Sequence, residues 1–145
     1  MRDAVGGTFM IKLLLIFLAV YTVFIAIAIN YAKAFKVKNK VINIIEQSEG
    51  VDYNDVSDAS VIGQINTYMN DIHYGINTSS VEKKCIGYDY INTERGYCIS
   101  KVENYDSSAS YYRVTTFVTI SVPIVRLEFT VPIKGETRKI ERINT

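Results

Sequence analysis

The chain of 145 residues has no tryptophan, a single histidine (His73), two cysteines and two prolines. So few histidines and cysteines are a poor source of the four ligands of an ordinary zinc site, and we expect no metal. The formal net charge is only +1, so no overall positive field attracts nucleic acid, and we predict no such partner. No spaced set of acid, base and nucleophile stands out, so we predict no enzyme, no catalytic residue and no cofactor.

Charge is also absent from a long apolar run near the N-terminus, Leu13–Ile29. Counted from Phe9, this run is about 21 residues long and is interrupted only by Lys12. A helix needs about 20 apolar residues to cross the hydrocarbon core of a bilayer. Lys12 lies near the end of the run, where a lysine side chain can reach the lipid headgroups. The sequence therefore predicts a single transmembrane helix at residues 8–30.

A secretory signal peptide is the main alternative for this run. The apolar core of such a peptide is usually about 7–15 residues long and ends at an A-x-A-like cleavage site. Ala32-Lys33-Ala34 has that form, but the run is longer than such a core and a basic, helix-favouring segment follows it. Cleavage there would leave that helix as a bare N-terminus, so we favour retention of the span.

The segment after the span, residues 31–49, has the pattern of an amphipathic helix. Its apolar residues share one side, whereas Lys33, Lys36 and Lys40 lie on the other. No glycine or proline interrupts Thr8–Gly50, so we predict one unbroken helix of about 40 residues, roughly 60 Å long. The residues expected to pack in the membrane or along this spine are Leu13, Phe17, Phe24, Ala34, Val37, Val41, Ile44 and Ile45.

Residues 50–145 are predicted to form one α+β domain. Its first segment, 52–58, is a polar loop whose acidic spacing departs from an EF-hand, and we favour a turn over a calcium site. A second helix is expected from about Asp58 to Ile72, because apolar residues recur there at helical spacing. Gly75 is the expected stop of this helix, and His73, without a nearby cysteine or histidine, is expected at the surface or an interface.

From about Val81 the apolar residues alternate with a period of two, which predicts β-strands. We expect an antiparallel sheet of about four strands, with one face against the helices and the other face polar and rich in tyrosine and threonine. A turn is expected at Asn92–Gly96, Pro123 should end the third strand, and Gly135 marks a turn or bulge. The expected strand runs are Ile86–Tyr90, Tyr97–Lys101, Tyr111–Val122 and Val131–Ile143.

The two cysteines, Cys85 and Cys98, flank the first predicted hairpin. Whether they face each other depends on where the turn is centred, so a disulfide and two free buried thiols both remain open. A disulfide would require an oxidising compartment. Thiol catalysis is not favoured, because the chain has no C-x-x-C motif and neither cysteine has an obvious basic neighbour.

A short leader ending in glycine, a retained apolar helix that continues as an amphipathic spine, and a C-terminal antiparallel sheet together resemble the type IV pilin-like superfamily. Within it, the layout is most similar to the TadE-like minor pilins, or pseudopilins, of tight-adherence and conjugation machinery in Gram-positive bacteria. The resemblance implies a leader at residues 1–7, processing between Gly7 and Thr8 with Gly6 as the fallback, and Phe9 as the aromatic second residue. Lys12 departs from the family, which commonly has glutamate at this fifth mature position.

This resemblance implies a mechanical function and not a chemical one. The span would hold the subunit in the membrane until an assembly platform extracts it, after which the apolar helices pack together in a surface filament. The implied partners are the lipid bilayer, other pilin-like subunits and a membrane assembly platform, with a prepilin peptidase as a further candidate. The polar, tyrosine-rich face of the sheet would then be the contact surface, since amphipathic aromatic residues suit interfaces.

The orientation of the domain has two interpretations. Pilin-type precursors keep the N-terminus inside, which would make residues 50–145 extracytoplasmic. Four lysines follow the span, whereas only Arg2 and Lys12 precede or enter it, and the positive-inside rule would place the domain in the cytoplasm. The alternative function is accordingly a membrane-anchored interaction module that faces the cytoplasm. The four lysines are Lys33, Lys36, Lys38 and Lys40.

Overall fold

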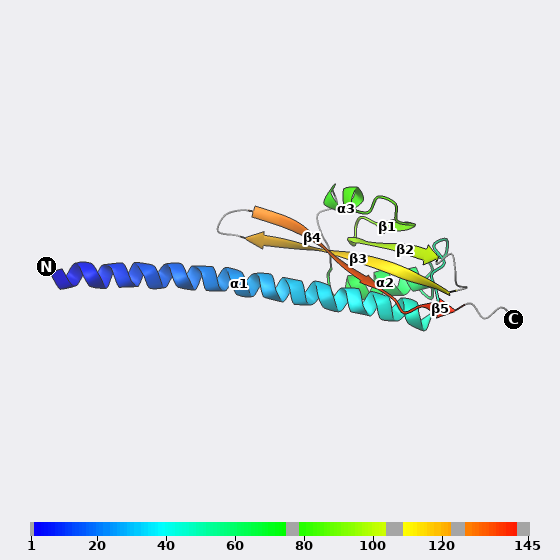
Figure 1. Cartoon of the computed structure of the whole chain (residues 1–145), viewed down its shortest axis with the longest axis horizontal. Helices are drawn as coiled ribbons and strands as arrows, with labels where there is room; N and C mark the ends of the chain where they lie inside the picture. Colours follow the sequence, from blue (N-terminus) through cyan, green and yellow to red (C-terminus); the bar gives the residue numbers. More distant parts are fainter. Residues whose placement is uncertain (1, 75–78, 104–108, 123–126, 142–145) are drawn as a thin grey trace.

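The structure of the chain is a computed structural model that describes residues 2–74, 79–103, 109–122 and 127–141 (Figure 1). It has the predicted α+β class, with a long apolar N-terminal helix, a short second helix and a four-strand antiparallel sheet. The elements are α1 (Arg2–Gln47), α2 (Val61–Asp71), α3 (Ser79–Lys84), β1 (Tyr90–Asn92), β2 (Tyr97–Glu103), β3 (Ala109–Val122), β4 (Leu127–Glu136) and β5 (Ile140–Glu141).

Helix α1 is unbroken over 46 residues, a length of about 70 Å at the usual rise per residue. It begins at Arg2, six residues before the expected start at Thr8, and it includes Gly6 and Gly7. A glycine in a helix costs only about 1 kcal/mol relative to alanine, so two glycines do not interrupt an otherwise strong helical sequence. The N-terminal half of α1 projects beyond the folded domain, whereas the C-terminal half lies under the sheet (Figure 1).

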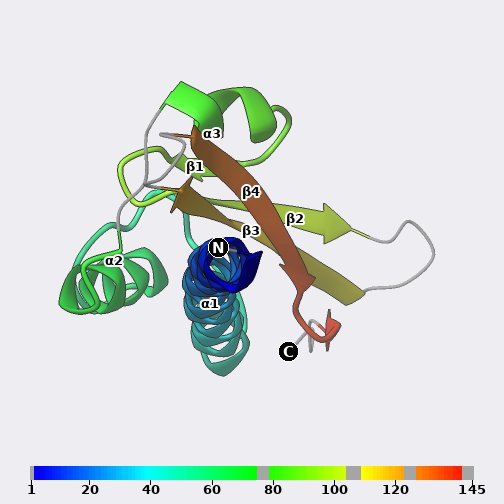
Figure 2. The same ribbon diagram turned by 90° about the vertical axis from the view of Figure 1, so that its left-hand side faces the viewer.

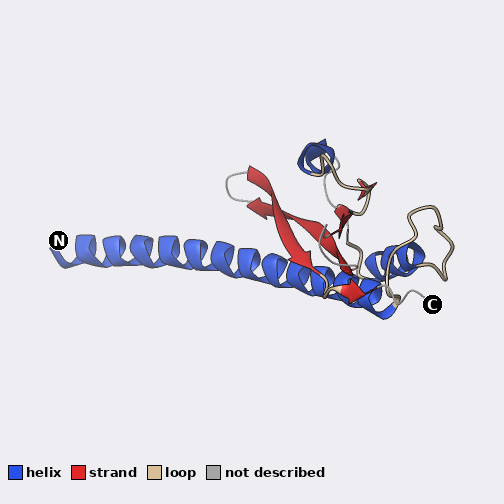
Figure 3. Cartoon of the chain, turned by 45° about the vertical axis from the view of Figure 1, so that its right-hand side comes forward, coloured by secondary structure: helices blue, strands red, loops and turns tan. Residues whose placement is uncertain are grey.

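The sheet has the strand order β1-β2-β3-β4, and each strand is antiparallel to its neighbours. The 14-residue strand β3 lies at its centre and also pairs with the two-residue strand β5. Helices α1 and α2 cover one face of the sheet, which we call the inner face, and α3 lies against the opposite, outer face (Figure 2). The cartoon coloured by secondary structure shows the same separation of layers (Figure 3).

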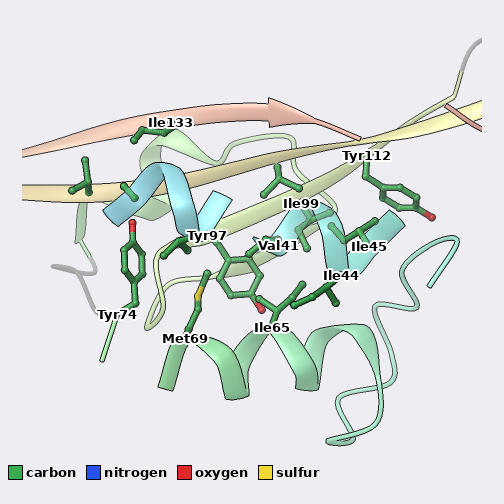
Figure 4. Close-up of a cluster of buried hydrophobic side chains, with 14 of the residues drawn as sticks. Val41, Ile44, Ile45, Ile65, Met69, Tyr74, Tyr97, Ile99, Tyr112 and Ile133 are labelled. Carbon is green, nitrogen blue, oxygen red and sulfur yellow. The ribbon is translucent and has the colours of Figure 1, made fainter. Parts of the chain in front are cut away.

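The hydrophobic core fills the space between the inner face and the two helices (Figure 4). The sheet contributes alternate residues such as Val114 and Val118, as expected for a strand with one face on a core. Helix α2 contributes Ile62, Ile65 and Met69, all fully buried. The predicted spine of α1 is buried as well, with relative exposures of 0% at Ala34, Val37, Val41 and Ile45 and 5% at Ile44.

Helix α2 begins at Val61, not at Asp58. The hydroxyl of Ser60 accepts a hydrogen bond from the Gly63 N–H at 3.0 Å, so Ser60 caps the helix and the preceding residues form a turn. The helix ends at Asp71, ahead of the expected stop. His73 is exposed and adopts a φ of 50°, which turns the chain out of the helix. Gly75 lies outside the described residues.

The prediction of a strand at Ile86–Tyr90 was wrong. Residues 79–84 form α3, and the first strand comprises only Tyr90–Asn92. Ile86, with 82% of its surface exposed, lies in the loop between them. The Cys85 N–H is hydrogen-bonded to the Val81 carbonyl at 3.0 Å, which continues the helical pattern up to the cysteine. The expected turn before Tyr97 is confirmed, with the Gly96 N–H bonded to the Asn92 carbonyl at 2.9 Å.

The prediction for the last strand was also wrong in its bounds. Strand β4 begins at Leu127, four residues before the expected start, and it pairs with β3 without a turn through Gly135. A Cβ atom at Gly135 would lie 2.8 Å from both Ile42 Cδ1 and Lys38 Cδ. Gly135 is therefore a point of close contact with side chains of α1, which would have to shift to admit a larger residue, and not a turn. Pro123 and Ile143 lie outside the described residues.

Candidate functional site

The N-terminal half of α1 is the most unusual surface of the chain. Among the residues that the structure describes, one helix, at Gly6–Gln47, is long and apolar enough to cross a membrane. None of the residues in its most apolar stretch of 18 residues is fully buried. Phe17 and Phe24 are 66% and 68% exposed, and Leu13 is 53% exposed. The segment is thus a candidate membrane span, although an N-terminal signal sequence can meet the same criteria of length and composition.

The change from exposed to buried surroundings occurs within α1 and without a linker. Val23 and Ile27, inside the apolar run, are partly buried and pack against the domain core. Ala34 is the first fully buried residue of the helix. The same rigid helix is consequently a candidate anchor at one end and a wall of the core at the other. Gly7 and Thr8, the predicted processing site, lie in its exposed N-terminal part.

The lysines that follow the span do not form one free basic face. Lys38 is only 9% exposed, and its ammonium lies 4.1 Å from the centre of the Phe35 ring, a cation–π distance. The Lys33 ammonium lies 6.0 Å from the centre of the Tyr74 ring. Lys36, in contrast, is exposed. At least two of the four lysines therefore contact the folded domain.

Lys40 lines an open cavity of about 460 Å³ between α1 and α2. Two carboxylates, from Asp58 and Asp71, also line it. It contains no histidine or cysteine, and its lining gives no nucleophile with a partner base. The remaining lining residues are Ile44, Gln47, Gln64, Thr67 and Tyr68.

Cys85 and Cys98 are bonded to each other, with Cα atoms 6.2 Å apart and 13 residues of separation. Cys85 follows α3, whereas Cys98 lies on β2, so the bond fastens α3 to the outer face of the sheet. Both cysteines are fully buried and pack with Val81 and Phe117. The two cysteines meet because the loop after Cys85 brings the chain back to β2. The spacing of the cysteines in the sequence did not determine the path of this loop.

The outer face is less open and less aromatic than the sequence suggested. Part of it is covered by α3 around the disulfide, and Phe117 is fully buried there. Tyr97 and Tyr112 are buried in the inner core, and Tyr90 is partly buried against it. The expected tyrosine-rich outer face therefore does not include these three tyrosines. The alternation of apolar residues alone did not indicate which face of the sheet the helices cover.

Two buried tyrosine hydroxyls hold the layers together. The Tyr74 hydroxyl donates a hydrogen bond to the Phe117 carbonyl, and the Tyr97 hydroxyl donates to Asn66 Oδ1 at 2.9 Å. Burial raises the pKa of Tyr74 and of Tyr97 above the ordinary value for tyrosine. The same Asn66 oxygen accepts a bond from Asn92 Nδ2 at 3.1 Å, so α2 is joined to the first hairpin.

The acidic loop after α1 forms turns. Asp52 Oδ1 accepts a hydrogen bond from the Asn54 N–H at 3.0 Å, and Asp55 Oδ1 accepts one from the Ser57 N–H at 2.9 Å. The bond from Ser57 lowers the pKa of the Asp55 carboxyl. The described residues contain no group of three or more histidine, cysteine, aspartate or glutamate side chains that could hold a metal ion.

Two long-range contacts have no signal in the sequence. Glu46 on α1 accepts hydrogen bonds from the Arg138 N–H at 2.7 Å and from Arg138 Nε at 3.2 Å. Lys84 on α3 donates to the Thr130 carbonyl of β4 at 2.5 Å. Partners 92 and 46 residues apart in the chain can be identified only after the strands have been placed.

Comparison with protein-family models, with curated proteins and with solved structures finds no match to this chain.

Proposed function

We propose that the chain is a non-enzymatic, single-pass membrane protein that serves as a pilin-like subunit, a minor pilin or pseudopilin of a surface filament, secretion or conjugation apparatus. The observation that carries this proposal is the unbroken helix α1, apolar and exposed at Phe17 and Phe24 and buried in the domain core from Ala34 to Ile45. An ordinary anchor needs no such continuity, because a flexible linker would hold the domain to the membrane equally well.

A rigid connection suits a subunit that must be held at a fixed angle to its neighbours. Side chains such as Leu13, Phe17 and Phe24 would contact lipid before assembly and the helices of other subunits after it. Removal of these residues from lipid into a helix bundle keeps them in apolar surroundings throughout, so the transfer involves no large loss of hydrophobic stabilisation. The domain supplies the outer surface of the assembly, and no cofactor or reaction is required.

The disulfide supports an extracytoplasmic location for the domain, because disulfides form and persist in oxidising compartments. The contacts of Lys33 and Lys38 with aromatic rings give these two residues a structural reason to follow the span. The number of lysines after the span is therefore weaker support for a cytoplasmic domain than the sequence alone suggests.

The mature N-terminus, measured by mass spectrometry of the protein purified from its own host, tests the proposal. A start at Thr8 or Gly7 is the expected result and reports prepilin-type processing. A start at Lys33 or Phe35 would show that the apolar run is a signal peptide and would overturn the proposal. An intact Met1 would leave a plain membrane anchor and remove the pilin-like assignment.

Two leader variants refine this measurement. The positions that Cβ atoms would take at Gly6 and Gly7 have open space around them, so larger side chains meet no neighbour in the folded chain. Gly7→Leu should block processing, whereas the matched control Gly6→Leu should leave a start at Thr8. Equal processing of both variants would contradict a cleavage site after Gly7.

The second candidate function is a membrane-anchored interaction module that faces the cytoplasm, favoured by the exposed lysines after the span, such as Lys36. A membrane-impermeant thiol reagent separates the two. In intact cells treated with reductant, labelling of Cys85 and Cys98 would place the domain outside. Labelling only after lysis, and without reductant, would place it in the cytoplasm with free thiols and would overturn the extracytoplasmic assignment.

A further inference from the structure

The hairpin formed by β3 and β4 reaches back along α1 toward its N-terminus, as far as about the middle of the helix (Figure 1). The two elements are in close contact at Gly135, which lies against the side chains of Lys38 and Ile42. Phe129 is six residues earlier in β4, or about 20 Å along the strand. The same distance corresponds to at most about 13 residues of α1, because β4 crosses the helix obliquely (Figure 2). Phe129 is therefore level with Ile27 or with the turn of α1 that follows it.

The burial of α1 agrees with this placement. Ile27 and Val23 are the first residues of the apolar run to pack against the domain core. The core cluster also contains Ile120, which is the register partner of Phe129 on β3. The domain core therefore extends to the level of Val23–Ile27, which belong to the predicted span.

Lys12 limits how deeply α1 can sit in a bilayer. Its ammonium must reach the headgroups, so the near edge of the hydrocarbon core lies close to Phe9–Lys12. A core about 30 Å thick takes up about 20 residues of helix, and its far edge falls between Ala28 and Tyr31. Tyr31 is exposed at that level, where tyrosine is enriched in membrane proteins. Phe129, level with Ile27 or with the turn that follows it, falls close to this edge.

Among the described side chains near this end of the hairpin, Phe129 is a large apolar residue that remains open to solvent. It is 48% exposed, whereas its partner Ile120 is only 8% exposed. Phe24 on α1, in the predicted span, is exposed as well. Exposed apolar side chains are therefore present on the sheet as well as on the span.

The open edge of β4 does not favour addition of another strand at this point. The Thr130 carbonyl is already bonded to Lys84. Backbone groups of alternate residues in a strand point to the same side, so Pro132 places its missing N–H on this edge as well. Proline in an edge strand and cover of the edge by a helix are common protections against pairing with a second chain.

We propose that the end of the β3–β4 hairpin rests in the bilayer interface, with the Phe129 side chain against the lipid acyl chains. Lipid would then contact the folded domain directly as well as its anchor. The inference rests on the membrane span of the proposed function, but not on pilin-like assembly and not on the side of the membrane that the domain faces.

The absence of tryptophan from the chain provides a direct test. Single tryptophans are introduced into the full chain as Phe129→Trp, as Phe17→Trp in the span, and as Ile86→Trp in the exposed loop beyond the outer face. Each protein is reconstituted in phosphatidylcholine vesicles with or without bromine on the acyl chains near the headgroups or near their ends. We expect bromine near the headgroups to quench Phe129→Trp, bromine near the chain ends to quench Phe17→Trp, and neither to quench Ile86→Trp.

The outcomes separate the inference from the proposed function. Quenching of Phe17→Trp without quenching of Phe129→Trp would overturn the inference and leave the membrane span intact. Absence of quenching at both positions would overturn both. Blue-shifted emission from Phe129→Trp without quenching would mean that a second copy covers the residue, which also overturns lipid contact.

A folding control accompanies these measurements. Retention of the Cys85–Cys98 bond, seen as a mobility difference between reduced and unreduced protein, shows that the variant domain is folded. If Phe129→Trp loses the bond, Glu128→Trp reports from an exposed neighbouring position on the same hairpin end. Its quenching by bromine near the headgroups supports the inference, and its resistance to quenching overturns it.

Discussion

Tyr74 connects three parts of the molecule through one side chain. Its hydroxyl donates to the Phe117 carbonyl in β3, and its ring faces the ammonium of Lys33 on α1. Tyr74 itself follows α2 and is 5% exposed. A buried carbonyl that loses its donor remains desolvated without a partner, which costs more than the hydrogen bond contributes on balance.

We predict that Tyr74→Phe lowers the free energy of unfolding by about 1–3 kcal/mol, because the Phe117 carbonyl is left unpaired. The measurement is urea unfolding of the full chain in detergent micelles, followed by circular dichroism. Tyr31→Phe is the matched control, since Tyr31 is exposed on α1, and it should leave the midpoint unchanged. Equal effects of the two substitutions would contradict the assigned role of the hydroxyl.

The same residues predict a loss of stability in alkali. Burial raises the pKa of Tyr74 and Tyr97 in the folded chain above the ordinary tyrosine value, which is about 10. A raised folded pKa contributes stability that is complete below the unfolded pKa and is lost as pH rises toward the folded pKa. Urea midpoints should therefore decline above about pH 10, and less steeply in Tyr74→Phe. A midpoint that does not change with pH in this range would refute the prediction.

Among the elements, α1 was the most predictable and α3 the least. The stripe from Ala34 to Ile45 has helical spacing over several turns, so its period could be recognised and its burial followed. The short helix at Ser79–Lys84 has too few residues for a period to be measured. Its position depends on the bond between Cys85 and Cys98, whose pairing becomes visible only once β2 is placed.

At the scale of this element, we predict that Cys85→Ser combined with Cys98→Ser lowers the free energy of unfolding by about 3 kcal/mol. The disulfide fastens α3 to the outer face, so Val81 and Phe117 should become more accessible while the inner core remains folded. Urea unfolding measures the first effect, and amide hydrogen exchange of residues 81–84 measures the second. Wild-type protein with reductant is the control and should behave like the double variant; unchanged exchange would contradict this account.

For the whole molecule, the sequence predicted the fold class and the residues of the spine but not how the layers are joined. Alternation indicated which residues of β3 share a face, and the structure shows Val114 and Val118 on the core. It did not indicate that Gly135 is a point of contact with α1, or that Glu46 is bonded to Arg138. Such contacts depend on packing between segments that are distant in the chain.

The continuity of α1 predicts that a break between anchor and domain changes the molecule without unfolding it. Ala32 is exposed and lies between the apolar run and the buried spine. Ala32→Pro removes one helical hydrogen bond and introduces a clash, at a cost of about 3 kcal/mol or more. We expect faster amide hydrogen exchange for residues 28–34 and unchanged exchange in α2 and β3. Ala32→Leu is the control and should match the wild type; faster exchange throughout the domain of Ala32→Pro would contradict the prediction.

The course of the β3–β4 hairpin back along α1 also has a mechanical consequence. A force that pulls on the N-terminal end of α1 acts along the helix axis, and it reaches the domain through the long contact with the sheet between Val23 and Ile45. The load is a shear, because helix and strands would have to slide past each other and all their contacts resist at the same time. A perpendicular pull would separate the contacts one after another. A lengthwise pull on α1 is therefore expected to leave the domain folded at forces at which a perpendicular pull would unfold it.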